Sequence, residues 1–125
     1  DSATMGNGQN VQDEGTLVST PVAGVTGAAS VSAGTGHIIV LLKNGTMRTW
    51  GHDGWGQAGI GTAGGYQMRP ASPKLTGVTA VFTPMSECFA ITSDGRLWFW
   101  GMGKYRLPGV MRDDKKVPTE ITPLW

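Results

Sequence analysis

The sequence predicts an all-β protein made of a tandem repeat. Twenty glycines and seven prolines among 125 residues disfavour helices and favour short strands joined by tight turns. Apolar residues occur in short runs that have the length and periodicity of strands. The whole pattern also returns at an offset of fifty residues without a gap, as in Trp50-Gly51 and Trp100-Gly101.

The repeat divides a single repeat domain, residues 1–125, into three parts. Residues 27–76 form the first full repeat, residues 77–125 form the second, and residues 1–26 form a partial repeat at the amino end. The two full repeats match at these pairs of positions: Gly27 and Gly77, Val31 and Val81, Leu41 and Ile91, Gly45 and Gly95, Trp55 and Tyr105, Gly59 and Gly109.

Each full repeat is expected to hold three antiparallel strands followed by a long loop. In the first repeat the strands are expected at residues 28–33, 37–43 and 46–50, with matching runs fifty residues later. Asn44-Gly45 and Asp94-Gly95 separate the last two strands of each set and predict two-residue type I′ hairpins. Residues 52–75 show no helical periodicity and are expected to return along an outer edge strand.

The strand expected at residues 37–43 is apolar on both faces, which indicates that it is covered on both sides. Such covering arises when one small sheet stacks against the next, as in a propeller or a solenoid. Trp50 and Trp100 end their strands with large rings that can pack between adjacent sheets, each burying on the order of 200 Å². Gln57 can hydrogen-bond the backbone of the glycine-rich loop that follows.

A motif in the first full repeat points to a known family. It comprises Val31-x-Ala33-Gly34-x-x-His37, Leu41-x-x-Asn44-Gly45, Trp50-Gly51 and Gly56-Gln57-x-Gly59-x-Gly61. Its order and spacing resemble the regulator of chromosome condensation repeat, and the match covers nearly the whole chain. The resemblance implies four-stranded antiparallel blades of a β-propeller, which has seven blades in that family. The second repeat departs from the motif at Pro84, Glu87 and Arg106-Leu107.

Two full repeats and part of a third are expected to form an incomplete β-propeller. Seven such repeats need roughly 350 residues at fifty residues each, and a pair of blades alone exposes apolar sheet faces. Three explanations are open: the chain is an excerpt of a larger protein, a partner chain completes it, or copies of it assemble. We favour the excerpt, because the amino end begins in the middle of a repeat.

Charge and motif spacing argue against several classes of function. The net charge is +1 and only 15% of the residues are charged, so we expect neither nucleic acid nor membrane phosphates as partners. The longest apolar stretch, residues 38–42, is too short to cross a bilayer. Gly54-x-Gly56-x-x-Gly59 matches a dinucleotide-binding fingerprint, but no helix can follow it, and no cofactor is expected.

The few histidines and the single cysteine do not form a recognisable catalytic or metal site. His37 and His52 have no carboxylate or thiol at the spacing of metal ligands. Neither histidine lies in a recognisable nucleophile setting, so we expect no catalytic residues and no enzyme activity. His37 is expected to be structural, and Cys88 to be a small buried apolar residue.

The best binding candidates are aromatic and polar residues of the two long loops. Aromatic rings and arginine on loops carried by a rigid sheet are typical of binding hot spots, although Trp55 and Tyr105 can instead pack against neighbouring blades. The candidates are His52, Asp53, Trp55, Tyr66 and Arg69 in the first repeat, and Met102, Lys104, Tyr105 and Arg106 in the second.

The sequence therefore predicts a non-catalytic recognition module that binds a protein or a cell-surface ligand through its loops. We expect it to be bacterial and extracellular or at the cell surface, as an adhesin, tip or inhibitor-like domain of a larger secreted protein. The resemblance implies a precedent, since secreted proteins with such repeats include an inhibitor of β-lactamases. The alternative is a nucleotide-exchange factor or chromatin-associated regulator, since the resemblance implies that eukaryotic members of the family include one.

Overall fold

The computed structural model describes residues 25–103 and 113–121, which form two four-stranded antiparallel sheets. In the first sheet the order is β1 (Ala28–Ala33), β2 (His37–Leu42), β3 (Met47–His52) and β4 (Tyr66–Ala71). In the second it is β5 (Val78–Phe82), β6 (Glu87–Thr92), β7 (Leu97–Gly101) and β8 (Lys115–Glu120). The all-β prediction is confirmed, and each sheet falls within one of the expected full repeats.

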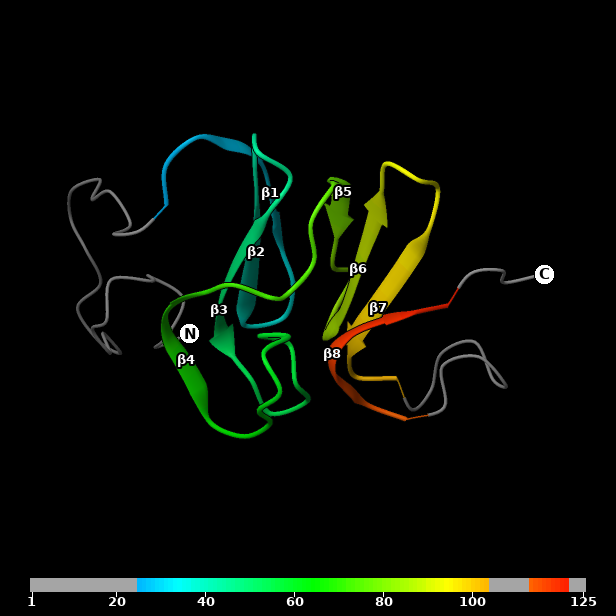
Figure 1. Cartoon of the computed structure of the whole chain (residues 1–125). Helices are drawn as coiled ribbons and strands as arrows, with labels where there is room; N and C mark the ends of the chain where they lie inside the picture. Colours follow the sequence, from blue (N-terminus) through cyan, green and yellow to red (C-terminus); the bar gives the residue numbers. More distant parts are fainter. Residues whose placement is uncertain (1–24, 104–112, 122–125) are drawn as a thin grey trace.

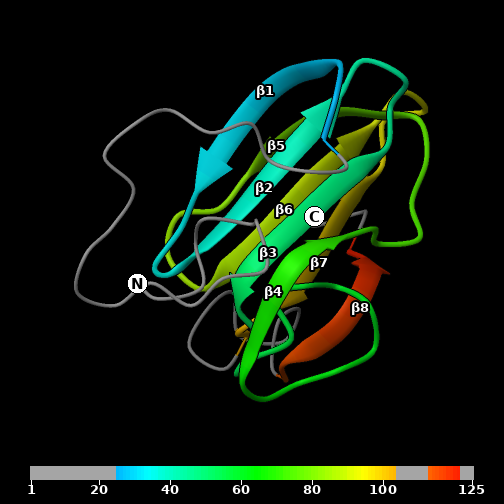
Figure 2. The ribbon, with the colours of Figure 1, turned by 90° about the vertical axis from the view of Figure 1, so that its left-hand side faces the viewer.

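The two sheets lie side by side in the molecule (Figure 1). In the view turned by 90°, the second sheet lies behind the first (Figure 2). Both have the same meander order, with β1 or β5 at one edge and β4 or β8 at the other. β4 is the edge strand expected at the end of the long loop, and it contains Pro70, whose missing N–H is tolerated at an edge.

Both hairpins differ from the expected two-residue turn. In the first, the N–H of Gly45 donates to the carbonyl of Leu42 at 3.0 Å, and the N–H of Leu42 donates to the carbonyl of Thr46 at 2.9 Å. The loop therefore holds three residues, 43–45, with Gly45 at a φ of 83°, as in a turn closed by a G1 bulge. The second hairpin repeats these bonds around Gly95, so the type I′ prediction is wrong in both.

The interface between the sheets is the main core. Ile39, Leu41 and Met47 of the first sheet pack with Cys88 and Trp100 of the second, and all five are buried. On the other face of the first sheet, a second cluster is formed by Val40, Leu42 and Trp50 together with the partly buried Val25 and Ile38. β2 is therefore covered on both faces, as its apolar sequence predicts.

The far face of the second sheet carries a row of aromatic rings. Phe82 stacks on Phe89 with ring centroids 4.9 Å apart, and Phe89 packs against Phe99 at 5.5 Å. Phe82 and Ile91 remain about 40% exposed, at 41% and 38%. Because Phe89 and Phe99 lie fifty residues after Ile39 and Thr49, which face the second sheet, this row occupies the face on which a further blade would pack.

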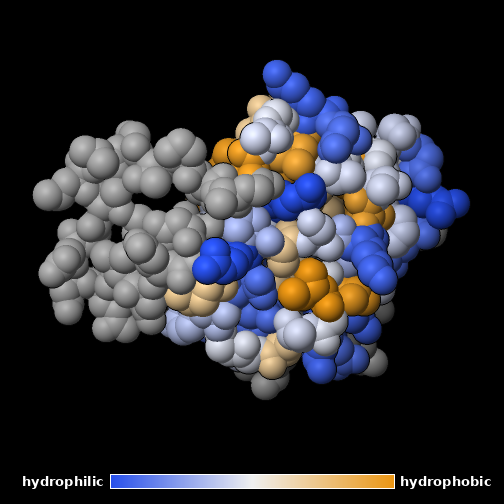
Figure 3. All heavy atoms as spheres, turned by 60° about the vertical axis from the view of Figure 1, so that its left-hand side comes forward, coloured by the Kyte–Doolittle hydropathy of each residue, from blue (hydrophilic) through white to orange (hydrophobic). Residues whose placement is uncertain are grey.

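Apolar side chains also reach the surface elsewhere. Figure 3 shows the side of the molecule on which the first sheet lies, and there the apolar residues form separate patches among polar residues. Among the residues that the structure describes, the most exposed large apolar side chains are those of Val31, Met85, Tyr66 and Val117. No helix in the described part of the chain is long and apolar enough to cross a membrane.

Candidate functional site

A pocket of about 260 Å³ opens where the long loop of the first repeat meets the start of β2 and the start of β6. Its lining residues are Thr35, Gly36, His52, Trp55, Tyr66 and Ser86. The N–H of Thr35 donates to the carbonyl of Met85 at 2.8 Å, which ties the rim of the first sheet to that of the second. The pocket therefore lies across the boundary between the two blades.

Asp53 gives the long loop its shape. Its side chain is buried, with Oδ1 accepting from the N–H of Ala58 at 3.0 Å and Oδ2 accepting from the hydroxyl of Thr62 at 2.6 Å. A carboxylate that holds two donors inside a loop fixes that loop and is not free to contact a partner. The structure thus gives Asp53 a framework role in place of the expected contact role.

Gln57 connects the loop to the pocket. It is fully buried; its Oε1 accepts from the N–H of Trp55 at 2.8 Å, and its Nε2 donates to Nδ1 of His52 at 3.0 Å. The N–H of Gly54 also points to this Nδ1, at 3.3 Å. Because both neighbours are donors, Nδ1 of His52 is an acceptor, and the ring proton of the neutral imidazole lies on Nε2. The expected bond from Gln57 to the loop backbone is confirmed.

The pocket wall is aromatic and held in place. The rings of His52 and Tyr66 meet edge to face, with centroids 5.5 Å apart and an interplanar angle of 82°. Trp55 is 39% exposed and Tyr66 is 51% exposed. The pocket can therefore offer apolar ring surface together with hydrogen-bonding groups on His52 and Tyr66, without first ordering a loose loop.

The pocket gathers His52, Trp55 and Tyr66 from the nine predicted candidates. Arg69 is exposed on β4 and Met102 follows β7, and neither lines the pocket. Lys104, Tyr105 and Arg106 lie outside the described residues.

Sequence reasoning missed Thr35, Gly36 and Ser86, which complete the lining of the pocket directly before β2 and β6. Gly36 and Ser86 occupy the same position in the two full repeats, fifty residues apart, each directly before a buried strand. That repeated position could have indicated the pocket, since equivalent loops of neighbouring blades lie at the same end of the stacked sheets.

At the start of β2, a small cluster of polar side chains bridges the two sheets. Nε2 of the buried His37 lies 2.7 Å from the hydroxyl oxygen of Thr83, which itself donates to the carbonyl of Glu87. Since that hydroxyl proton is engaged, Nε2 is the donor to Thr83. Sγ of Cys88 is 3.4 Å from the same nitrogen, and burial raises the pKa of this thiol far above its usual range. These residues form a structural interface, with Cys88 as an inert buried thiol.

Acidification is expected to destabilise the fold through His37. Burial lowers its pKa, aided by His52 and opposed by the backbone of Thr35 and by Glu87. The unfolded chain therefore binds the proton first as the pH falls. The free energy of unfolding should decrease below about pH 6.5, by at most about 1.4 kcal/mol per pH unit, until the folded-state pKa is reached.

Urea denaturation at pH 7.5, 6.5 and 5.5 measures this slope. His37→Gln should remove the contribution of His37, whereas His52→Gln should keep most of it, because burial is the largest cause of the lowered pKa. An equal loss of stability on acidification in the native chain and in His37→Gln would assign the effect to another group.

The arrangement of two stacked meander sheets agrees with the family expected from the motif. The sequence model of the Regulator of chromosome condensation (RCC1) repeat matches residues 28–57, from β1 to Gln57 of the pocket loop. The chain belongs to the RCC1 repeat family. His37, Trp50 and Gly51 lie within this match.

Curated relatives extend the likeness beyond one RCC1 repeat. The mitochondrial RCC1 domain-containing protein RUG3 of Arabidopsis thaliana is 30% identical over 123 residues, which cover 94% of this chain and 27% of RUG3. The guanine nucleotide exchange factor SRM1 of Saccharomyces cerevisiae is 27% identical over 86 residues, which cover 66% of this chain and 18% of SRM1. The chain thus spans about a quarter or less of these relatives.

A solved structure shows the same fold. Prp20p from Saccharomyces cerevisiae, described together with its binding to Gsp1p and histones, aligns with a TM-score of 0.67 at 20% identity. The alignment covers 83% of this chain and 27% of Prp20p. The two sheets are therefore neighbouring blades of an incomplete RCC1-type β-propeller, as predicted.

The predicted extracellular or cell-surface location is wrong. The relatives are named as a mitochondrial protein, as an exchange factor and as regulators of chromosome condensation, the last in fly and human. Mitochondria and chromosomes lie inside the cell, and no name among these relatives refers to secretion. The RCC1 repeats in the sequence do not indicate the cellular location of the protein, because blades pack in the same way in every compartment of the cell.

Proposed function

We propose that this chain is a non-catalytic, protein-binding part of an RCC1-type β-propeller, and that the pocket between its two blades contacts the partner. The observation that supports this is the fixed aromatic wall at a blade boundary. Trp55 is positioned by Gln57, Tyr66 packs on His52, and both aromatic rings stay exposed. Exposed rings on a rigid frame lose little conformational freedom on binding and are typical of hot spots.

The pocket suits an inserted side chain of a protein better than a small-molecule substrate. Its volume of about 260 Å³ is below the roughly 300–1,000 Å³ of most small-molecule sites. Its polar groups, the hydroxyls of Thr35, Ser86 and Tyr66, can meet backbone or side-chain groups of a partner. We propose no catalysis here, since the side chains that line the pocket include no nucleophile activated by a base.

The double substitution Trp55→Ala/Tyr66→Ala is expected to weaken partner binding by about 2 kcal/mol or more, roughly thirtyfold, because it removes two central aromatic contacts. Native and variant chains serve as matched baits for affinity capture with quantitative mass spectrometry, followed by calorimetry on the partner found. Val31→Ala is the control, since Val31 is more exposed, at 64%, and does not line this pocket.

Equal capture of the partner by the double variant, with an unchanged denaturation midpoint, would remove the pocket from the binding surface. Loss of the partner in Val31→Ala but not in Trp55→Ala/Tyr66→Ala would move the contact to the surface around Val31.

A second candidate is a nucleotide-exchange or chromatin-associated regulator. It is supported by the name of SRM1 and by the binding of Prp20p to Gsp1p and histones. Accelerated release of a fluorescent guanine nucleotide from a small GTPase would favour it over a role in protein binding alone. The adhesin and tip roles depended on an extracellular location and have no place in either candidate. The inhibitor-like role and the bacterial origin stay predictions.

A further inference from the structure

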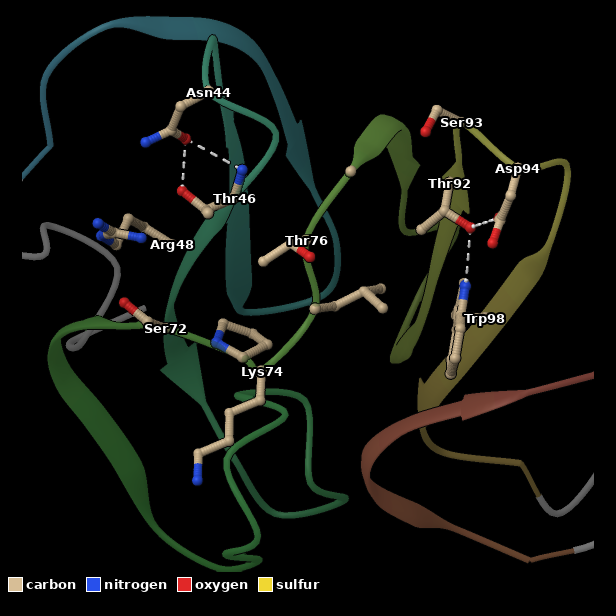
Figure 4. A pocket seen from close by; sticks show the side chains of 13 residues that line it. Asn44, Thr46, Arg48, Ser72, Lys74, Thr76, Thr92, Ser93, Asp94 and Trp98 are labelled. Atoms are coloured by element: carbon tan, nitrogen blue, oxygen red, sulfur yellow. Dashed lines mark hydrogen bonds between the residues drawn. The ribbon is translucent and has the colours of Figure 1, made fainter.

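A larger groove lies at the opposite end of the strands from the aromatic pocket. It has a volume of about 1070 Å³ and runs between the β2–β3 hairpin, the β6–β7 hairpin and the link that joins the two sheets. Figure 4 shows Arg48 and Lys74 on the side of the first sheet, and Asp94 and Trp98 on the side of the second. The groove therefore has two unlike walls.

The wall on the first sheet carries positive charge that the described residues do not neutralise. In the described part of the chain, neither Arg48 nor Lys74 makes an ion pair. One nitrogen of Arg48 donates to the carbonyl of Met47 at 2.9 Å, which anchors the guanidinium and leaves its other N–H groups for a ligand. Lys74 is exposed at the link between the sheets.

The acidic group across the groove does not balance this charge. Asp94 accepts from the hydroxyl of Thr92 at 2.6 Å, and its other oxygen lies 3.5 Å from Nε of Arg96. The bond from Thr92 lowers the pKa of Asp94, so its carboxylate stays ionised and pairs locally with Arg96. Trp98 donates from Nε1 to Thr92 at 3.1 Å and adds half-buried aromatic surface to this wall.

The groove continues into a smaller apolar pocket. This pocket has a volume of about 390 Å³ and shares Ser72 and Lys74 with the groove. Its other walls include Ile60, which is 37% exposed, and Val117, which is 49% exposed. A ligand that spans both spaces meets two cations first and an aliphatic surface directly beyond Lys74.

We infer that this groove binds an extended peptide segment of a partner protein in which acidic residues stand next to a large aliphatic one. The carboxylates pair with Arg48 and Lys74, and the aliphatic side chain packs between Ile60 and Val117. A peptide supplies both chemistries within a few residues, at about 3.3 Å per residue. Nucleic acid fits less well, since its affinity grows with the number of phosphates neutralised and the groove offers two cations.

An array of octapeptides tests this on the 125-residue chain. Each peptide alternates glutamate with leucine or valine, and matched peptides carry glutamine for glutamate or serine for the aliphatic residue. Binding is followed by fluorescence anisotropy. The glutamate–aliphatic peptides should bind, both matched sets should bind more weakly, and added salt should weaken the interaction because exposed ion pairs are screened.

A charge-reversed pair of variants locates the site. Arg48→Glu/Lys74→Glu should weaken binding by about tenfold or more. Lys43→Glu/Arg69→Glu makes the same change of charge outside the groove and should leave binding unchanged. Ile60→Ser should weaken only the peptides with an aliphatic residue, and Trp55→Ala should change nothing, which separates this groove from the aromatic pocket.

Three results would overturn the inference. The first is that no acidic–aliphatic peptide in the array binds. The second is that both charge-reversed variants bind like the native chain or lose binding equally. The third is that a single-stranded oligonucleotide competes with the peptides through the same two cations, which would assign the groove to nucleic acid.

Discussion

Trp100→Ala is expected to lower the free energy of unfolding by about 3–5 kcal/mol, the usual cost of truncating a large buried aromatic residue. Trp100 is fully buried at the interface between the two blades, where it packs with Ile39, Leu41 and Met47 of the first sheet. Its Nε1 donates to the carbonyl of Gln57 at 2.9 Å. The ring therefore attaches the pocket loop of the first repeat to the second sheet.

Urea denaturation followed by near-ultraviolet circular dichroism measures the loss. Native domains have only about 5–15 kcal/mol of stability, so the alanine variant can fail to fold. Trp100→Phe keeps most of the apolar contact and loses the bond to Gln57, and we expect it to cost about 1–3 kcal/mol. A denaturation midpoint for Trp100→Ala close to that of the native chain would contradict the assigned role of Trp100 in the packing between the two blades.

The strands could be predicted because their signals are local. Apolar runs, turn dipeptides and the fifty-residue offset placed β1, β2 and β3 within a few residues of their observed bounds. The turn type could not be read in the same way. Asn44-Gly45 suits a two-residue turn and a three-residue turn equally. The hydrogen bonds that Leu42 makes with Gly45 and Thr46 decide between them, because they include Lys43 in the loop.

The site was predictable only in part, for the same reason. The aromatic residues of the long loop could be chosen by type, and three of them line one pocket. The role of Asp53 depends on donors five and nine residues further along, at Ala58 and Thr62, which no local pattern announces. The rim at Ser86 and the cationic groove beside Lys74 exist only where two sheets meet, so they depend on contacts between distant parts of the chain.

Gly51→Ala is expected to lower the free energy of unfolding by at least about 3 kcal/mol, because it combines backbone strain with a steric clash. Gly51 has a φ of 106°, and a Cβ built there would lie 2.4 Å from the carbonyl oxygen of Gly36 and 2.7 Å from Cα of His37. Both contacts are with backbone atoms at the start of β2 and directly before it, which cannot rotate away. Chemical denaturation measures the effect.

Gly95→Ala is the matched control. Gly95 has a similar φ of 85°, yet an added Cβ would meet no atom within 4 Å, so only the backbone cost of about 1–2 kcal/mol applies. Equal losses in the two variants would mean that the clash at Gly36 is relieved by movement.

The two glycine variants also differ in their expected effect on binding. Gly36 lines the aromatic pocket, and its carbonyl accepts from the N–H of His52 at 2.7 Å. A methyl group at Gly51 therefore pushes against the residues that hold His52 and the rim in register. At a temperature where both variants are folded, Gly51→Ala should weaken partner binding at the pocket and Gly95→Ala should not. Unchanged binding by a folded Gly51→Ala variant would separate the partner contact from the geometry of this rim.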